Sequence, residues 1–353
     1  MLIFQGALVS ARGAEVIQIG KIKLSQAKSA LMAAASFIKT EDDVFIVPDY
    51  KDGNLKLYDI NGNLIKIWGT KGPGPLEFLS PVSCDYKKPL IAIFDLANQR
   101  IFIYRRVGRT EFERLSEFVC LLDKPNIKLL EDQVLIPGFI AVSATKQYGL
   151  YMRNLKTGHI QYILPEEIKY GFTSFSQFDS QRLNTVPVGT AGYCDTYGNF
   201  IYYVWEGNLR IIKINKLTNK YEFFGETPNN YVKPRVTKEL QEGFRILSRE
   251  VIEAEFSKMS FITGIFADKD FVGVIYKKYD AKKSLWEMSL QLYTPEGKLF
   301  SETVLANAVT YINFRANNSF YDRDKRILYY LSIVYDENTS LDKYEIIMYK
   351  INL

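Results

Sequence analysis

The chain has 353 residues, of which 47% are hydrophobic and 14% aromatic, a composition that supplies a large core and excludes a disordered chain. Its net charge of +5 comes from 45 basic and 40 acidic residues spread along the sequence, which excludes the dense basic patches of nucleic-acid-binding and membrane-surface proteins. No apolar run approaches the roughly 20 residues that a membrane-spanning helix needs, so we expect no transmembrane segment.

The first 30 residues fit two interpretations. Residues 2–4 and 7–11 resemble the end of a secretory signal, and Val9-Ser10-Ala11 would suit a signal peptidase, although no basic segment precedes them. An ordinary N-terminal strand fits equally well. In either case residues 16–19 and 22–24 could add the outer strand of the last repeat and close a ring.

A three-strand unit is clearest between residues 43 and 69. Strand-like runs at residues 44–47, 55–59 and 64–68 are separated by the turn signals Asp52-Gly53 and Asn61-Gly62-Asn63. Such a short sheet cannot bury both of its faces alone, whereas radial stacking of several sheets buries them.

The same pattern recurs along the rest of the chain, with later copies that begin near residues 90, 127, 195, 271 and 327. Six copies predict an all-β fold, a six-bladed β-propeller that forms a single domain over residues 1–353. A ring of seven blades with one degenerate copy is the alternative.

One helical segment, at about residues 236–258, is predicted between the fourth and fifth copies. Its apolar residues recur at spacings of four, three, four and three and form a single stripe of Leu240, Phe244, Leu247, Val251 and Ala254. This insertion either packs on the propeller itself or forms a lid or partner-docking element beside the central channel. In the second case, ligand or partner would be bound by Tyr231, Arg235, Arg245 and Arg249.

The most informative motif is Gly-Thr-Lys-Gly-Pro-Gly-Pro-Leu-Glu-Phe-Leu-Ser-Pro at residues 69–81, followed by Asp-Leu-Ala-Asn-Gln-Arg-Ile-Phe-Ile-Tyr at residues 95–104. Over this stretch the chain resembles the NHL-repeat-like and TolB-like six-bladed propellers of bacteria, whose turn reads Gly-Pro-Gly-Glu-Phe. Here Pro75-Leu76 is inserted before Glu-Phe. The resemblance implies the fold and an envelope-facing protein, in the periplasm or on the cell surface, with the cytoplasm as the alternative. It says almost nothing about the ligand.

Most residues of this motif have expected structural roles. Phe78 can wedge between neighbouring sheets, Asp95 and Asn98 suit a turn at a strand end, and Arg100 could bind a nearby carboxylate. Lys71, on the turn itself, is the one residue of the motif that we expect to face a ligand.

The sequence also restricts the chemistry. His159 is the only histidine and lies in a predicted surface turn, so a site with several histidine ligands is excluded and a Ser-His-Asp triad would need His159 itself. Three scattered cysteines, at positions 84, 120 and 194, predict buried free thiols. We expect no metal and no cofactor. The paired carboxylates lack EF-hand spacing and are interpreted as solvated turns: Asp42-Asp43, Glu166-Glu167, Asp268 with Asp270, and Asp322 with Asp324.

The favoured function is a binding or scaffold propeller, expected to be a monomer, that recognises a glycan, peptide or protein partner at the central channel face. We expect no nucleic-acid partner. The alternative is a polysaccharide lyase or hydrolase that uses Tyr, Arg and carboxylates, because a tyrosine base beside an arginine needs no histidine. A site that gathers a Tyr, an Arg and two carboxylates would favour the enzyme.

Overall fold

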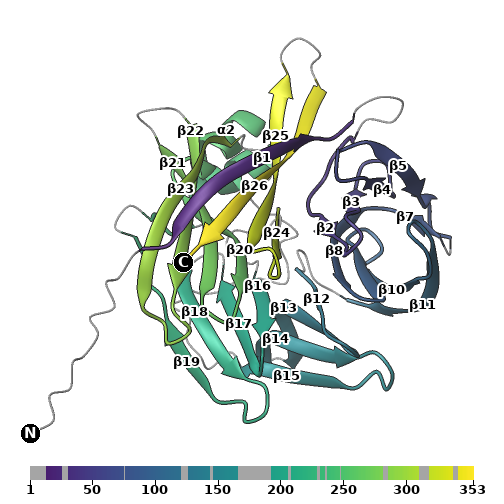
Figure 1. Cartoon of the computed structure of the whole chain (residues 1–353), viewed down its shortest axis with the longest axis horizontal. Coiled ribbons are helices and arrows are strands. Elements are labelled where there is room, and N and C mark those ends of the chain that lie inside the picture. The colour runs from purple at the N-terminus through teal and green to yellow at the C-terminus, as the bar shows by residue number, and fades with distance from the viewer. Residues whose placement is uncertain are drawn as a thin grey trace, which may run out of the picture.

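The structure is a computed structural model that describes residues 13–25, 31–74, 76–120, 126–143, 146–165, 192–205, 208–228, 231–234, 237–246, 248–280, 285–309, 318–336 and 341–353. Six four-stranded antiparallel sheets surround a common centre, and the first strand of each sheet lies nearest that centre (Figure 1). The chain is therefore a six-bladed β-propeller, as predicted.

The strands follow one another from the inside of each sheet to the outside. The first three sheets comprise β2 (Ile38–Lys39), β3 (Phe45–Asp49), β4 (Asn54–Tyr58) and β5 (Leu64–Trp68); β8 (Pro81–Lys87), β9 (Leu90–Asp95), β10 (Arg100–Arg106) and β11 (Phe112–Val119); and β12 (Lys128–Leu129), β13 (Gln133–Ser143), β14 (Lys146–Asn154) and β15 (Ile160–Pro165).

The other three sheets comprise β16 (Gly192–Tyr197), β17 (Phe200–Trp205), β18 (Asn208–Asn215) and β19 (Tyr221–Phe224); β20 (Ser260–Ala267), β21 (Val272–Asp280), β22 (Leu285–Tyr293) and β23 (Leu299–Val309); and β24 (Ser319–Asp322), β25 (Ile327–Asp336), β26 (Leu341–Asn352) and β1 (Glu15–Lys23).

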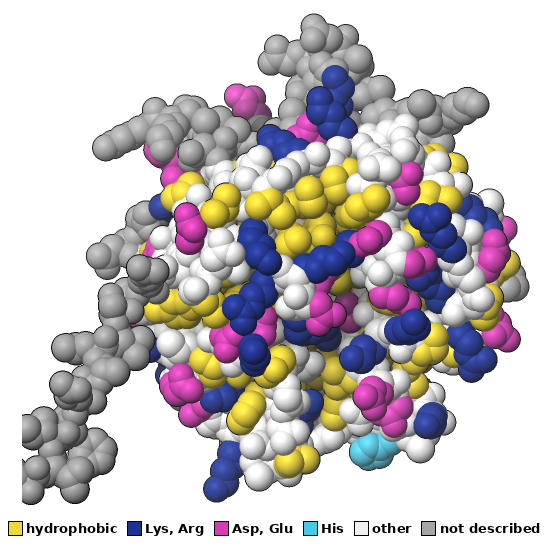
Figure 2. Space-filling model, in the orientation of Figure 1, with side chains coloured by type: hydrophobic (Ala, Val, Ile, Leu, Met, Phe, Trp, Pro, Cys, Tyr) yellow, Lys and Arg dark blue, Asp and Glu magenta, His cyan; other side chains and the backbone are white. Residues whose placement is uncertain are grey.

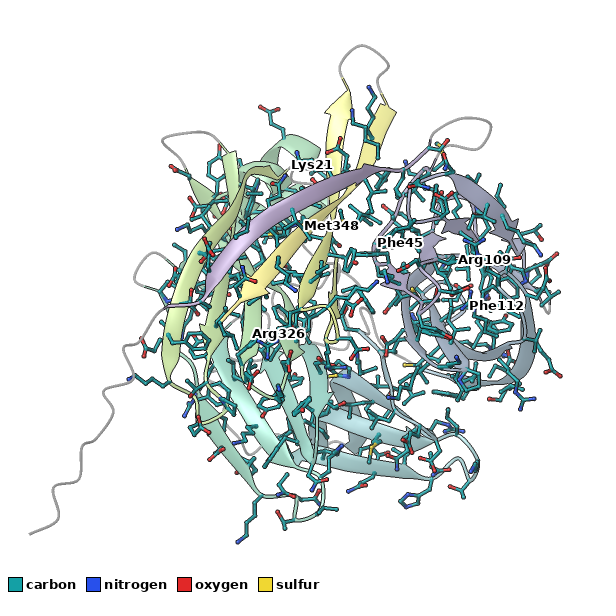
Figure 3. The ribbon with its side chains drawn as sticks, viewed as in Figure 1. Lys21, Phe45, Arg109, Phe112, Arg326 and Met348 are labelled. Atoms are coloured by element: carbon teal, nitrogen blue, oxygen red, sulfur yellow. The ribbon has the colours of Figure 1, made fainter. Side chains whose placement is uncertain are left out.

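The sixth sheet joins the two ends of the described chain. β1 pairs antiparallel with β26, from Glu15 opposite Asn352 to Lys23 opposite Glu345, with a register shift between Gln18 and Gly20. Figure 3 labels Lys21 and Met348 on these two neighbouring strands. The N-terminal segment thus supplies the outer strand of the last sheet. The stretch that resembles a signal, residues 2–11, lies outside the described residues.

The hydrophobic core is divided into six clusters, and each cluster fills the space between two neighbouring sheets. Between the first and second sheets, Phe78 is fully buried and its ring lies 5.8 Å from Trp68 and 5.7 Å from Phe102. Phe78 is therefore the wedge that the sequence predicted. Phe78 lies in the short strand β7 (Glu77–Phe78), which pairs in parallel with the preceding short strand β6 (Thr70–Lys71).

The end of the second strand carries the same anchoring aspartate in two sheets. Asp95, at the end of β9, accepts the backbone N–H groups of Leu79 at 2.7 Å and Ser80 at 2.9 Å, and its carboxylate also binds Asn98. Asp49, at the end of β3, accepts two successive N–H groups of the segment before β2, at 2.7 and 3.1 Å. Both aspartates are fully buried, so each fixes the entry of the chain into its own sheet.

The helical segment consists of two short helices, α1 (Lys238–Arg245) and α2 (Arg249–Phe256), and not of one. The break lies at Ser248, whose N–H binds the Gly243 carbonyl and whose hydroxyl accepts the Val251 N–H at 3.4 Å, as a residue at a helix N-terminus does. In the described part of the chain, no helix is long and apolar enough to cross a membrane.

Because the helix breaks, the predicted apolar stripe is only partly correct. Leu240 is buried, as expected, but Ala254 is exposed and Phe256 is buried in its place. Leu240 and Phe256 belong to the cluster between the fifth and sixth sheets, where the Phe256 ring lies 5.6 Å from Phe261. These two helical side chains thus pack on the propeller.

Candidate functional site at the centre of the ring

Each of the six first strands carries a charged residue in the strand or directly after it. These residues are Lys39, Asp85, Lys128, Asp195, Asp268 and Asp322, with Arg323 next to the last. Because the first strands lie nearest the centre (Figure 1), these residues are placed around it. We call Asp85, Lys128, Asp195, Asp268 and Arg323 the central ion cluster.

Lys128 of the third sheet connects the second and fourth sheets. Its Nζ lies 3.5 Å from Asp85 Oδ1 and 3.2 Å from Asp195 Oδ1. The other Asp85 oxygen accepts the Leu129 N–H at 2.7 Å, and the other Asp195 oxygen accepts the Ala267 N–H at 2.9 Å. Asp195 Oδ1 accepts no hydrogen bond from the described residues, so the ammonium near it is held by charge and not by a well-aligned bond.

Arg323 reaches from the sixth sheet across the fifth to the fourth. Its Nε donates to the Ala267 carbonyl at 2.8 Å, and its Nη2 donates to the Thr196 carbonyl at 3.0 Å and to Asp195 Oδ2 at 2.5 Å. Figure 3 labels Arg326, which lies on the same β24–β25 turn near the centre of the ring. The guanidinium is therefore fixed by three acceptors from two other sheets.

The first sheet is joined to this network through Lys39. Its Nζ lies 2.5 Å from Asp43 Oδ1 and 3.6 Å from Asp322 Oδ2 of the sixth sheet. With this contact, ion pairs at the centre connect five of the sheets, and the fifth sheet joins them through the hydrogen bonds of Ala267 and Asp268.

The environment moves the pKa values of the two bridged carboxyls in opposite directions. Burial, reinforced by the nearby Asp195 charge, raises the pKa of Asp85 even though Lys128 opposes the shift. Burial also acts to raise the pKa of Asp195, but Arg323 and Lys128 outweigh it and lower that pKa. Asp195 is therefore the firmly ionised carboxylate of the pair.

The cationic side chains of the cluster are more exposed to solvent than its two bridged carboxylates. The side chains of Lys128 and Arg323 are 26% and 36% exposed, whereas those of Asp85 and Asp195 are 9% and 5% exposed. The buried carboxylates hold the cations in place, and both cationic side chains are partly exposed. Figure 2 shows basic and acidic side chains interspersed over one face of the molecule, so this face does not present a field of one sign.

The centre also brings together the residue types expected of the enzyme alternative. Tyr321, Asp268, Asp195 and Arg323 lie close to one another, because the Tyr321 hydroxyl donates to Asp268 Oδ2 at 2.8 Å and Asp268 lies near enough to Arg323 to raise its pKa. Tyr321 is only 9% exposed and stacks on Phe266 at 4.5 Å. Burial and the bond to Asp268 raise the pKa of its phenol, whereas a tyrosine base needs a lowered pKa.

Of the five site residues predicted from sequence, the three with described side chains do not lie together. Lys71 is exposed between the first and second sheets and donates to the Lys51 carbonyl at 3.1 Å. Tyr231 is buried between the fourth and fifth sheets, with its ring 5.9 Å from Tyr276. Arg245 is exposed on α1 and pairs with Glu242. The Arg249 side chain and the whole of Arg235 lie outside the described residues.

The structure also places other residues that the sequence analysis singled out. His159 is exposed in a turn, and the three cysteines are buried and free, as expected. Arg100 pairs with the Glu117 carboxylate. The interpretation of Asp268 as a solvated turn residue is wrong, because this carboxylate is 6% exposed and bonded to Tyr321. Glu166-Glu167 lies outside the described residues. Within the described ranges, no group of three or more His, Cys, Asp or Glu residues could hold a metal ion.

No family model and no curated protein matches the sequence. Among solved structures, a member of the DUF4221 family from Bacteroides vulgatus ATCC 8482 matches with a TM-score of 0.67 at 11% identity, covering 98% of this chain and 100% of that one. A candidate exported protein from Bacteroides fragilis NCTC 9343 matches with a TM-score of 0.58 at 14% identity, covering 96% of each chain. At these identities the likeness shows a shared fold.

Proposed function

We propose that this protein is a binding propeller whose ligand or partner docks at the centre of the ring, over Lys128 and Arg323. The observation that carries the proposal is the contrast between these two partly exposed cations and the buried carboxylates that fix them. Side chains already held in place lose little conformational entropy when a ligand binds, so such an arrangement favours recognition.

The protein belongs, in this proposal, with the NHL-like and TolB-like propellers of the bacterial envelope. The segment at residues 69–104 supports this assignment through its sequence. The similar fold of a candidate exported protein is consistent with export to the periplasm or the cell surface.

The proposal is tested by a thermal-shift screen of glycans, peptides and metal ions against the wild-type protein and Lys128→Met. The expected result is a ligand that raises the melting temperature of the wild type and has little effect on the variant. A ligand that shifts both proteins equally would place the binding site elsewhere. If no small ligand binds, pull-down from a cell-envelope extract with both proteins makes the same comparison for a macromolecular partner.

One observation favours a hydrolase as the second candidate. Asp85 and Asp195 lie on one ammonium group and have pKa values shifted in opposite directions, which is the usual division between a general acid and an ionised carboxylate. Their low exposure makes this the weaker candidate. Hydrolysis of an oligosaccharide that is lost in both Asp85→Asn and Asp195→Asn would support it, and the absence of product from a broad glycan panel would reject it.

A further inference from the structure

Both cations at the ring centre keep donors that the described residues do not use. Arg323 donates hydrogen bonds from Nε and Nη2 to three acceptors, and no described residue binds Nη1. Lys128 lies 3.2 and 3.5 Å from its two carboxylates, longer than the roughly 2.7–2.9 Å typical of charge-assisted hydrogen bonds. The Lys128 ammonium and the Arg323 guanidinium can therefore donate hydrogen bonds to a further, anionic partner.

The two cationic side chains lie close together. Lys128 and Arg323 contact the two oxygens of the same carboxylate, Asp195. A planar group with two oxygens could thus bind Nη1 of Arg323 with one oxygen and the ammonium of Lys128 with the other.

The carboxyl groups around the two cations disfavour a dianion. Three carboxyl groups surround the two cations, and both Asp85 and Asp268 are close enough to influence the pKa of Arg323. A dianion such as phosphate would be repelled more strongly by these carboxyls than a group with a single charge. A cationic ligand is disfavoured, because the more exposed groups of the cluster are the donors Lys128 and Arg323 and the carboxylate acceptors Asp85 and Asp195 are largely buried.

We propose that the ligand carries a carboxylate, which Lys128 and Arg323 bind at the ring centre. This inference rests on the proposed function, since it names the chemistry of the ligand at that same site. A sugar acid and the C-terminal carboxylate of a peptide share this chemistry, and the experiment separates them.

The test is calorimetric titration of the full chain with two matched pairs of probes. Glucuronate is compared with glucose, and N-acetylglycine with N-acetylglycinamide, so each pair differs in its carboxylate. We expect at least one acid to bind with a Kd of about 1 mM or lower and its uncharged counterpart to bind at least tenfold more weakly. The pair of probes that shows this difference in affinity identifies the ligand as a sugar acid or as a peptide C-terminus.

Variants then assign the binding to the cluster. Asp85→Asn removes a neighbouring carboxyl, so it should bind the acid at least as tightly as the wild type. Lys128→Met combined with Asp85→Asn removes the cation without leaving an unpaired Asp85 carboxylate, and it should bind at least tenfold more weakly. Arg323→Lys keeps the charge but loses Nη1, and it should weaken binding several-fold. Arg326→Met, on the same turn, is the matched control and should bind like the wild type.

Several results would overturn the inference. Equal binding of acid and uncharged probe would remove the carboxylate as the determinant, as would the absence of binding by both acids at about 10 mM. Unchanged acid binding in both the double variant and Arg323→Lys would remove the cluster as the site. An uncharged glycan or peptide that binds in a manner dependent on Lys128 would refute the carboxylate and leave the proposed function intact.

Discussion

Arg323 and Asp195 are joined across the centre of the ring, with Nη2 2.5 Å from Oδ2, although they lie 128 positions apart in the chain. The six hydrophobic clusters each connect neighbouring sheets, whereas this pair connects the sixth sheet to the fourth. It therefore stabilises a relationship that apolar packing between neighbours does not fix directly.

Loss of this ion pair should destabilise the whole ring. Arg323→Met leaves the buried Asp195 carboxylate with Lys128 as its remaining cation, so we expect a loss of about 2–3 kcal/mol in the free energy of unfolding. Urea denaturation measures this change. Arg326→Met removes a pair with Asp270, a carboxylate far more exposed than Asp195, and should cost under about 1 kcal/mol. Equal effects of the two changes would contradict the central role of Arg323.

Phe78 should account for much of the contact between the first two sheets. Phe78→Ala opens a cavity among Trp68, Phe102 and Tyr104, and we expect a loss of about 3–5 kcal/mol. Thermal denaturation followed by circular dichroism measures it. Leu76→Ala, two residues earlier and half exposed, is the control and should change stability by less than about 0.5 kcal/mol. A small effect at Phe78 would show that the wedge is dispensable.

The anchoring aspartate is expected to act through its acceptor oxygens. Asp95→Asn replaces one acceptor of the Leu79 and Ser80 N–H groups with a donor, which should cost about 1–3 kcal/mol. Asp324→Asn alters an exposed carboxylate and is the matched control. Urea denaturation of the two variants distinguishes them, and indistinguishable midpoints would argue against the anchoring role.

Lys277 should make stability depend on pH. Burial lowers the pKa of this lysine from 10.5 to about 7 in the folded protein. Between about pH 7 and 10 the unfolded chain therefore binds more protons than the folded one, so stability should rise with pH by up to about 1.4 kcal/mol per unit. Lys277→Met should remove this component and stabilise the protein at pH 7, whereas Lys298→Met, at an exposed site, should keep it. Unfolding free energies at pH 7.5, 8.5 and 9.5 for the three proteins test the prediction, and parallel pH profiles would refute it.

The fold was accessible from sequence because it depends on local signals. Alternating apolar residues and turn signals such as Asn61-Gly62 mark strands one at a time, and Phe78 occurs in a motif whose spacing indicates a wedge. The break of the helix at Ser248 was missed, because the apolar spacing continues through it and the capping bonds are visible only in three dimensions.

The central ion cluster could not be found in the same way, because its members lie on different sheets and far apart in the chain. A signal existed in the Cys-Asp pairs at Cys84-Asp85 and Cys194-Asp195, which recur in the first strands of two sheets. The predicted rim residues Tyr231 and Arg245 were chosen for their nearness to the helical insertion, and sequence did not show that Tyr231 is buried.

Docking of a ligand over Lys128 and Arg323 can be seen in a crystal structure with a ligand from the thermal-shift screen. We expect ligand density within hydrogen-bonding distance of Lys128 Nζ and Arg323 Nη1, at the centre of the ring. Density on α1 and α2, or beside Lys71, with the central ion cluster untouched, would contradict it.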